Sequence, residues 1–384
     1  MVSGLGPHRS WGAWAACGYL SAALAVVLLR RRGPEVSVAV AAVGAVLAPL
    51  LVLVPDGRGQ SEVGVIERSG SLLLHTGTPY LADPQSVAEY TPYLPGMALL
   101  GLPRALLDGS PLGDARLWCA AVFLLCVLRT VPAGCRLGAA ALTASPVVAL
   151  PLCVSGVDLP LTGLCWLALV RAAERRPVAA GLALAAACSL KWTAWPALAV
   201  VAALLAATAG RRAALRGAAV AVGAAAMAVL PVALRAPGPL VEQVFAFPTG
   251  RGRLPTPAAS PLPGRLLAGL AVGASLLTRP PRTAAAAAHR LALGLSAAFL
   301  LAPAGRFGYL ALPLVLVLLS FPLSVPKGLP WAPPSSSPTT SRRARAGSRP
   351  SSRPWPTASP ATTSWSTPRP NRARSATTPL SPTR

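Results

Sequence analysis

The sequence has few charged residues, and acids are especially scarce. Of its 384 residues, 12% are charged and 53% are hydrophobic, and Asp and Glu together number only 11. Soluble globular domains usually have about 25% charged residues, whereas the mean hydropathy of this chain is +0.56. The composition therefore excludes an ordinary soluble domain and predicts an integral membrane protein whose surroundings are a lipid bilayer.

Residues that would indicate metal binding or disulfide bonding are also sparse. The seven cysteines are scattered through apolar runs without C-x-x-C spacing, and the chain has three histidines. This pattern predicts neither a disulfide framework nor a zinc site. Free cysteine commonly behaves as a small buried hydrophobic residue, so we expect that role here and no protein-built metal site.

Basic residues are in excess, with a formal net charge of +24, which raises the question of a nucleic-acid partner. Ten of them lie from Pro326 onward, where there is no acid, and this leaves +14 for the first 325 residues. Short loops rich in Lys and Arg stay on the cytoplasmic side of a membrane, so the charge is explained by topology and no nucleic-acid partner is predicted. Much of the +14 lies in short arginine clusters between apolar runs, at 30–32, 129–136, 171–176, 211–216 and 279–282.

Eleven apolar runs alternate with these clusters, which predicts an all-α, polytopic fold with about eleven transmembrane helices. Several runs are shorter than the roughly 20 residues that a span needs, and the two that flank Lys191 could instead form one long helix. The first run ends at a triple arginine and not at a small-residue cleavage site, so no cleaved signal peptide is predicted. The runs are Trp11–Leu29, Val36–Val54, Leu117–Val131, Leu137–Cys153, Leu159–Val170, Pro177–Leu190, Trp192–Thr208, Ala218–Leu234, Leu266–Leu277, His289–Ala302 and Tyr309–Leu323.

The segment between the second and third runs differs from the rest of the chain. Residues 55–116 hold seven of the eleven acids, and the predicted topology makes them a long first extracytoplasmic loop. A carboxylate there can act as a general base toward a hydroxyl, or it can simply keep the loop soluble. Apolar pieces of the loop, such as Leu94–Leu107, are broken by prolines, so we expect helices that lie on the membrane surface. A second outer loop is expected at 236–264.

A series of short elements carries a resemblance to a known family. In chain order they are Glu62, Val65-Ile66, Gly70, Leu72-Leu73-Leu74, Gly77, Pro79-Tyr80, Tyr90-Thr91-Pro92-Tyr93-Leu94-Pro95-Gly96, Gly113-Asp114-Ala115-Arg116, Lys191-Trp192-Thr193-Ala194-Trp195-Pro196, Ser260-Pro261-Leu262-Pro263-Gly264 and Arg306-Phe307-Gly308-Tyr309. Their order resembles the glycosyltransferase 87 family of the GT-C class over about residues 36–324. The chain departs from the family pattern at Glu62, where aspartate is usual, and at Ile66, where a tyrosine is expected.

The resemblance implies a polytopic mannosyltransferase of the plasma membrane with an extracytoplasmic active site. Such an enzyme transfers a sugar from a polyprenyl-phosphate donor to the hydroxyl of a glycan, lipoglycan or protein acceptor. By this resemblance Glu62 would be the catalytic base, with Glu67 as its competitor. The absence of a Gly-rich phosphate loop agrees with a lipid-linked donor, and a divalent ion could bridge the donor phosphate and an outer acid.

Further residues are candidates for substrate binding. Lys191 and Arg306 could contact the donor phosphate, as could Arg251 and Arg253 of the second outer loop, although cations at helix ends also extend to the membrane surface for solvation alone. Asp158 could line the same cavity or cap the helix that follows it. The resemblance also implies substrate contacts for three loop tyrosines: Tyr80, Tyr90 and Tyr93.

Two other classes of function remain open at the level of sequence. A multi-pass transporter or flippase of lipid-linked or small substrates would have a similar composition. Such proteins tend to keep ionisable residues near the bilayer midplane and to show related halves, whereas here the acids lie in loops and no internal repeat is evident. A membrane scaffold without activity would leave the long acidic loop unexplained.

The C-terminal segment forms a separate region of the sequence. We predict a membrane domain over residues 1–325 and a basic tail over 326–384 that is rich in Pro, Ser, Thr and Arg. Such a tail cannot bury a core and is expected to be disordered. It could bind anionic lipid from the cytoplasmic side, or it could be the out-of-frame translation of a GC-rich gene that has lost its last helices.

Overall fold

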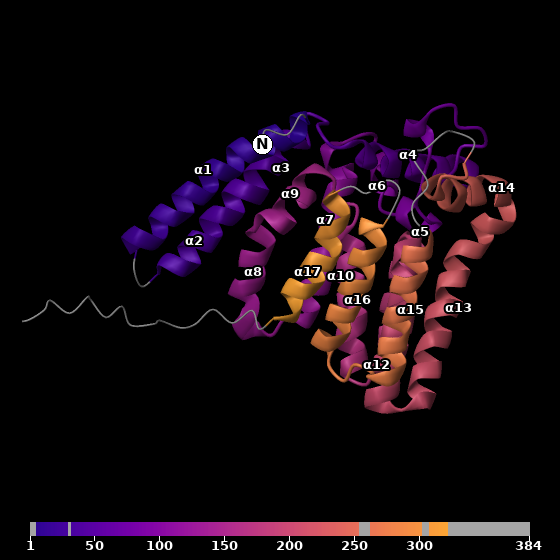
Figure 1. The fold of residues 1–384 in the computed structure, drawn as a ribbon. Helices are drawn as coiled ribbons and strands as arrows, with labels where there is room; N and C mark the ends of the chain where they lie inside the picture. Colours follow the sequence, from indigo (N-terminus) through magenta and orange to yellow (C-terminus); the bar gives the residue numbers. More distant parts are fainter. Residues whose placement is uncertain (1–4, 30–31, 253–261, 302–306, 322–384) are drawn as a thin grey trace, which may run out of the picture. The chain divides into compact units, whose positions relative to one another are not determined.

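The computed structural model describes residues 5–29, 32–252, 262–301 and 307–321, and within these ranges it contains helices and no strand. The chain divides into one unit over Met1–Leu329 and a second over Pro330–Arg384. The predicted tail at 326–384 lies outside the described residues. The fold is therefore all-α, as the sequence predicts, and Figure 1 shows its helices.

The helices follow one another with short connections. Before the first loop they are α1 (Gly6–Leu29), α2 (Gly33–Ala42), the π-helix η1 (Val43–Leu47) and α3 (Ala48–Leu53); in the loop α4 (Ser61–Thr76), η2 (Val87–Glu89), α5 (Pro95–Ala98), α6 (Leu102–Leu106) and η3 (Pro111–Gly113). After it come α7 (Ala115–Thr130), η4 (Ala133–Cys135), α8 (Arg136–Ala144), α9 (Pro146–Val154), α10 (Leu159–Ala173), α11 (Pro177–Leu190), η5 (Trp192–Ala194), α12 (Pro196–Ala209), α13 (Arg211–Arg235), α14 (Pro237–Leu240), the π-helix η6 (Val241–Ala246), η7 (Phe247–Thr249), α15 (Leu262–Thr278), α16 (Ala284–Leu300), η8 (Phe307–Leu310) and α17 (Ala311–Ser320).

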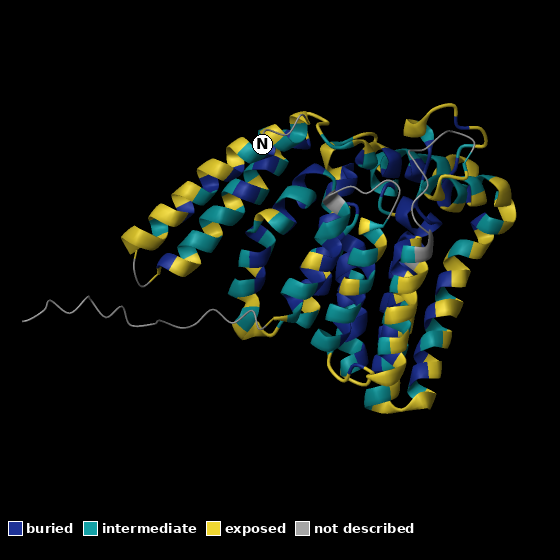
Figure 2. Ribbon diagram, in the orientation of Figure 1, coloured by how far each residue is buried: buried dark blue, intermediate teal, exposed yellow. Residues whose placement is uncertain are grey.

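Within the described residues the eleven predicted apolar runs coincide with helices, except that the run Leu137–Cys153 is divided at Ser145 between α8 and α9. Within the described residues, four helices are long and apolar enough to cross a membrane: Gly6–Leu29, Gly33–Leu53, Trp192–Ala209 and Arg211–Arg235. A fifth candidate is the pair Ala133–Ala144 and Pro146–Val154, which is bent by 60°. Other apolar helices, such as α10, α11 and α16, have 10–17 residues. The chain is a polytopic membrane protein, and the apolar side chains exposed along α1 (Leu20 is 73% exposed) fit contact with lipid (Figure 2).

Lys191 separates two helices. Its backbone is extended, with φ −154° and ψ 138°, between the end of α11 and the start of η5. The alternative of one long helix through Lys191 is therefore wrong. The Leu94 amide of the first loop donates to the Leu190 carbonyl at 3.0 Å, so Lys191 lies beside the first loop.

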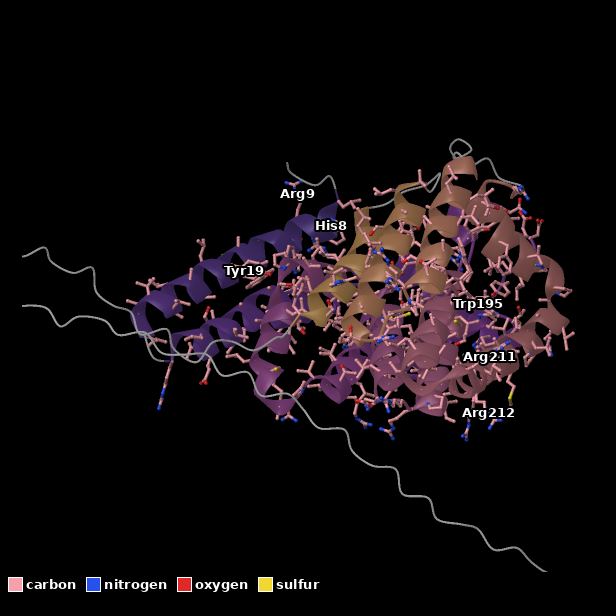
Figure 3. The ribbon with its side chains drawn as sticks, turned by 60° about the horizontal axis from the view of Figure 1, so that its bottom comes forward. His8, Arg9, Tyr19, Trp195, Arg211 and Arg212 are labelled. Carbon is pink, nitrogen blue, oxygen red and sulfur yellow. The ribbon has the colours of Figure 1, made fainter. Side chains whose placement is uncertain are left out.

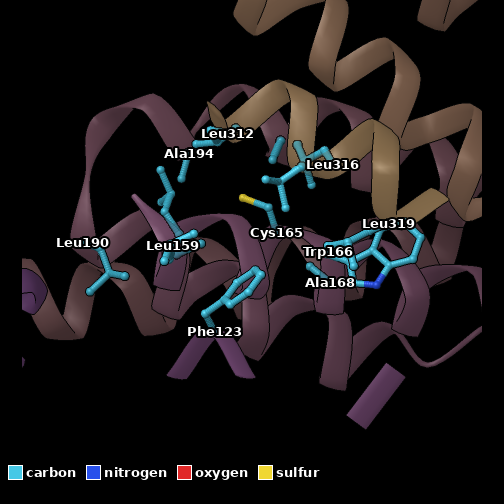
Figure 4. Packing of buried hydrophobic residues seen from close by; sticks show 14 of the residues in the cluster. Phe123, Leu159, Cys165, Trp166, Ala168, Leu190, Ala194, Leu312, Leu316 and Leu319 are labelled. Atoms are coloured by element: carbon cyan, nitrogen blue, oxygen red, sulfur yellow. The ribbon is translucent and has the colours of Figure 1, made fainter. Parts of the chain in front are cut away.

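The core lies where α10 packs between α7 and α17. Small residues permit the close contact: a Cβ at Gly163 of α10 would lie 3.1 Å from Phe123 Cα of α7. Cys165 and Leu316 are both buried in this cluster (Figure 4). Five of the seven cysteines are buried, which confirms the predicted role for those five, whereas Cys17 is exposed and Cys135 is half-buried.

The two ends of the helices differ in charge. At one end, Arg171 of α10 donates a hydrogen bond from Nη2 to the Arg129 carbonyl at the end of α7, at 3.0 Å. Arg211 and Arg212 lie at the turn between α12 and α13 (Figure 3). The acid-rich loop connects the other ends, because its residues contact the ends of α3, α9 and α11. The side of the membrane on which each end lies stays a prediction.

The first loop is a folded layer. Its helix α4 buries Val63, Val65, Ile66, Ser69 and Gly70 on one face. All four residues of α5 are buried, and Gly96 lies directly against Ser189 of α11. The prediction that the Leu94–Leu107 stretch lies on the membrane surface is therefore wrong for α5, because the protein itself covers it. The neighbouring α6 has no buried residue.

A buried ion pair joins the loop to the membrane helices. The Arg116 guanidinium lies 2.7 Å from Asp114 Oδ2, and the side chains are 1% and 6% exposed. Arg116 also donates to the carbonyls of Leu53 at 3.2 Å, Cys153 at 2.9 Å and Arg58 at 3.0 Å. It thus supplies donors to the C-terminal ends of α3 and α9, where carbonyl groups lack partners within the helix.

Replacement of Arg116 by methionine is expected to lower stability by about 3–5 kcal/mol, because it leaves the Asp114 carboxylate buried without its partner. The measurement is thermal unfolding of the purified protein in detergent. The matched control is Arg176→Met, because Arg176 is 62% exposed and lies 4.0 Å from Glu174, and exposed pairs contribute at most about 1 kcal/mol. Equal effects of the two variants would contradict the anchoring role of Arg116.

Helix α1 and the π-helix η1 are in contact through glycines, Gly18 and Gly44. A Cβ at Gly18 would lie 2.7 Å from Gly44 Cα, whereas a Cβ at Gly12, also in α1, would meet nothing within 4 Å. Trp11 Nε1 donates to the Ala45 carbonyl at 2.8 Å across the same interface. The contact therefore tolerates no side chain at Gly18 or Gly44.

Gly44→Ala is expected to lower the unfolding temperature, because overpacking costs about 1–3 kcal/mol. Gly12→Ala is the control, and it should be neutral or stabilising by up to about 1 kcal/mol through helix propensity. Thermal unfolding of both variants in the same detergent makes the comparison. A neutral Gly44→Ala would mean that the two helices do not make this contact.

Candidate functional site

Lys191 and Asp158 form an ion pair at the loop end of the helices. The Nζ atom of Lys191 lies 2.7 Å from Asp158 Oδ1, and the side chains are 11% and 19% exposed. Asp158 immediately precedes α10, but its side chain makes no capping hydrogen bond to that helix. The predicted role of Asp158 as a helix cap is therefore wrong. Its carboxylate instead pairs with the ammonium group of Lys191.

Two tyrosine rings also face the Lys191 ammonium. Its Nζ lies 5.6 Å from the ring centroid of Tyr93 and 4.9 Å from that of Tyr309. The Leu94 amide donates to the Leu190 carbonyl at 3.0 Å, which fixes Tyr93 beside Lys191. An ammonium within about 6 Å of an aromatic face is attracted by the ring quadrupole, so the site is built for a retained cation.

Glu62 belongs to the same electrostatic environment. Burial alone would lower the pKa of Lys191, but the Asp158 carboxylate, Tyr309 and Glu62 outweigh it and raise the pKa. Lys191 is therefore a cation at neutral pH. Glu62 lies in the first turn of α4, and its charge is among those that raise the pKa of Lys191.

Thr193 is a site residue that sequence reasoning missed. It lies in η5, two residues after Lys191, and is 8% exposed. Its hydroxyl oxygen is buried and has no hydrogen-bond partner, although buried polar groups normally have one. Only its position beside Lys191 and Trp192 in the sequence gave a signal. A buried hydroxyl without a partner in the protein is available for a hydrogen bond to a ligand.

Glu67, the other predicted catalytic acid, is held by protein groups. Its Oε1 accepts the Ala115 amide at 3.1 Å, and its Oε2 lies 3.7 Å from Arg104 Nε. Burial raises the pKa of Glu67, against the opposing effects of the Ala115 hydrogen bond and of Arg104 and Arg116. Glu67 thus connects α4 to the start of α7.

The three predicted tyrosines differ in their surroundings. Tyr80 donates from its hydroxyl to the Tyr93 carbonyl at 2.9 Å, and burial raises its pKa. Tyr90 donates to Glu242 Oε1 at 3.2 Å and stacks on Phe247 with centroids 4.2 Å apart. Tyr93 alone of the three faces Lys191. Substrate binding by Tyr80 and Tyr90 stays a prediction, and both rings support the loop.

The second outer loop contributes two residues that the sequence did not single out. Gln243 is fully buried, and its Oε1 accepts the Thr91 amide at 3.0 Å. Glu242 is the partner of Tyr90. The predicted phosphate ligand Arg306 and its alternative Arg253 lie outside the described residues, whereas Arg251 is exposed.

The described residues contain no group of three or more His, Cys, Asp or Glu side chains that could hold a metal ion. Participation of a divalent ion therefore stays a prediction. The arrangement that is present combines a buried cation, an unpartnered hydroxyl and a neighbouring carboxylate. These groups can neutralise an anion and accept a proton beside it.

Glu67→Gln is expected to change how stability depends on pH. A carboxyl group whose pKa is raised in the folded state contributes stability that is present below its ordinary pKa of about 4.3 and is lost as the pH rises through the raised pKa. The variant keeps an acceptor for the Ala115 amide but cannot ionise. Its unfolding temperature should therefore fall less than that of the unmodified protein between about pH 4 and pH 7. Parallel curves would contradict the burial of an ionisable Glu67.

The chain is similar to few known proteins. No family model matches the chain, and no curated protein matches it. The fold is similar to the crystal structure of ArnT from Cupriavidus metallidurans in the apo state, with 18% identity and a TM-score of 0.45. The match covers 68% of this chain and 54% of that chain, so this chain spans about half the length of that protein. A similarity this weak does not assign the family or the activity.

Proposed function

We propose that this chain is a membrane glycosyltransferase of the GT-C class that transfers mannose from a polyprenyl-phosphate donor to an acceptor hydroxyl. Transfer takes place at the extracytoplasmic face of the plasma membrane, and the acceptor is a glycan, a lipoglycan or a protein. The observation that carries the proposal is the buried Lys191 together with the unpartnered hydroxyl of Thr193, two residues later in the chain. The choice of mannose rests on the resemblance to the glycosyltransferase 87 family.

In this proposal Lys191 and Thr193 bind the phosphate of the donor. A lysine ammonium has three N–H donors, and Asp158 accepts one of them at 2.7 Å. The others, together with the Thr193 hydroxyl, can donate to phosphate oxygens. Because they lie in a largely dry site, they stabilise the charge that develops on the departing polyprenyl phosphate.

Glu62 is the proposed base. The acceptor oxygen forms a bond to the anomeric carbon while the bond from that carbon to the phosphate oxygen breaks, with inversion. The acceptor proton passes to the Glu62 carboxylate, and the electron pair of the broken bond stays on the phosphate. Glu62 is preferred to Glu67 because Glu67 accepts the Ala115 amide and lies beside Arg104, whereas Glu62 adds to the field at Lys191.

The surroundings of the site suit a donor with a long apolar tail. Trp192 and Trp195 are 40% and 41% exposed beside Lys191, and exposed tryptophans are typical of the boundary between membrane and water. The phosphate of a membrane lipid lies at this depth, so it can reach the buried ammonium while its tail stays in the bilayer.

The test is sugar transfer from radiolabelled polyprenyl-phosphate mannose in membranes that contain the protein. Glu62→Gln is expected to lower the rate by about 10²–10⁴-fold, as for loss of a general base, and Glu67→Gln should keep most of it. Thr193→Val should weaken donor binding without loss of stability, because the hydroxyl has no partner in the protein. Thr143→Val on α8, whose hydroxyl donates to the Ala139 carbonyl, is the matched control.

Loss of transfer in Glu67→Gln with full activity in Glu62→Gln would move the base to Glu67. No transfer by the unmodified protein, combined with movement of a lipid-linked sugar across vesicles, would favour the transporter or flippase hypothesis. Glu35→Gln, at an exposed acid at the start of α2, controls for a general effect of removing a carboxylate.

A further inference from the structure

A cavity of about 420 Å³ lies where the first and second outer loops meet. The first loop contributes Ala82 and Pro84, and the segment 237–243 forms the remaining wall. The residues of that segment that line the cavity are Pro237, Gly238, Pro239, Val241, Glu242 and Gln243. This volume is within the range of about 300–1,000 Å³ that is usual for small-molecule sites.

Hydrogen bonds between the two loops hold the cavity in shape. Gln243 is fully buried, and its amide group accepts from the Thr91 amide at 3.0 Å and donates to the Leu81 carbonyl at 2.6 Å. The preceding residue, Glu242, accepts from the Tyr90 hydroxyl. Both lie in the π-helix η6, a rare form that occurs frequently at functional sites.

The chemistry of the walls selects the ligand. Glu242 lies in the wall, and its carboxylate, which accepts from the Tyr90 hydroxyl, has several lone pairs that accept hydrogen bonds from hydroxyl groups. Pro237 and Pro239 have no backbone N–H to offer and present apolar rings. A neutral, hydroxyl-rich ligand with apolar C–H faces fits these walls.

The cavity is also close to the candidate catalytic groups. Tyr90 contacts Glu242 in the wall of the cavity, and Tyr93 faces Lys191. The two tyrosines are three residues apart in the chain. Tyr90 and Leu94 have extended backbone, so three residues cover at most roughly 10 Å. A ligand of two or three sugar units in the cavity could therefore extend one end toward Lys191.

We propose that this cavity binds a saccharide and is the subsite that holds the acceptor glycan. The acceptor role rests on the proposed function, whereas saccharide binding itself does not require transfer. Glu242 accepts hydrogen bonds from the sugar hydroxyls, and the proline rings pack against the sugar faces.

Gly238→Trp is the informative variant, because a Cβ at Gly238 meets nothing within 4 Å and a large side chain there can fill the cavity without displacing the backbone. The matched control is Gly134→Trp in η4. A Cβ at Gly134 also meets nothing within 4 Å, and Gly134 does not line the cavity. Saturation-transfer NMR with mannobiose, maltose and lactose is measured on the purified full chain in a detergent without a sugar headgroup. Unfolding temperatures establish that both variants are folded.

Mannobiose binding that is at least ten-fold weaker in Gly238→Trp and unchanged in Gly134→Trp supports the proposal. No disaccharide binding by the unmodified protein, or equal binding by both variants, overturns it. Trilysine is the competing probe: if Gly238→Trp removes trilysine binding and leaves disaccharide binding intact, the cavity takes a cationic peptide and the proposal is wrong.

A second measurement separates this proposal from the proposed function. Polyprenyl-phosphate binding should be weakened by Thr193→Val and unchanged by Gly238→Trp. If saccharide binding depends on Gly238 while sugar transfer is absent, the cavity assignment stands and the transferase assignment fails. If transfer is present and disaccharides do not bind at the cavity, the reverse holds.

Discussion

The buried Arg116 guanidinium is the interaction on which the loop end of the molecule depends. The carbonyls at the end of a helix lack partners and carry partial negative charge. One planar group with five N–H donors serves the ends of α3 and α9, the loop carbonyl of Arg58 and the Asp114 carboxylate. Both the start and the end of the first loop are thereby fixed to the same cation. The position of α4, and of Glu62 on it, follows from that anchor.

The second buried ion pair uses the same construction for a different purpose. Asp114 precedes α7 and Asp158 precedes α10, so each carboxylate lies near the positive end of a helix dipole, and each holds a buried cation. Arg116 uses all its donors on protein oxygens and has a structural role. Lys191 has a single hydrogen-bonded carboxylate and two aromatic rings as neighbours, which leaves donors for a ligand. The number of oxygens around each cation distinguishes the anchor from the candidate site.

The positions of the helices could be predicted from the sequence, because apolar length is a local property. Within the described residues the runs coincide with helices, and the extended backbone of Lys191 shows that the runs on either side of it are two separate helices. Contacts between distant residues could not be predicted in this way. Tyr90 and Glu242 are 152 positions apart, and no pattern in either segment predicts a contact with the other. The burial of α5 was missed for the same reason: its prolines suggested an exposed stretch, but Gly96 fits against Ser189 only when α11 is in place.

Contacts between distant residues also explain why the sequence spacing did not distinguish the two acids of α4. Glu62 and Glu67 are five residues apart in a helix and are of one chemical type. The two carboxylates differ in their surroundings. Glu67 accepts the Ala115 amide and lies beside Arg104, whereas Glu62 interacts electrostatically with Lys191. Thr193 was missed because an unsatisfied hydroxyl is a property of packing.

The attachment of the first loop to α11 has a consequence for how reactants arrive. The Leu94 amide is bonded to the Leu190 carbonyl, and Gly96 has no room to move toward Ser189. A segment seated in this way cannot swing open like a lid above Lys191. If the chain acts as proposed, a donor with a long hydrocarbon chain enters sideways from the bilayer, between helices.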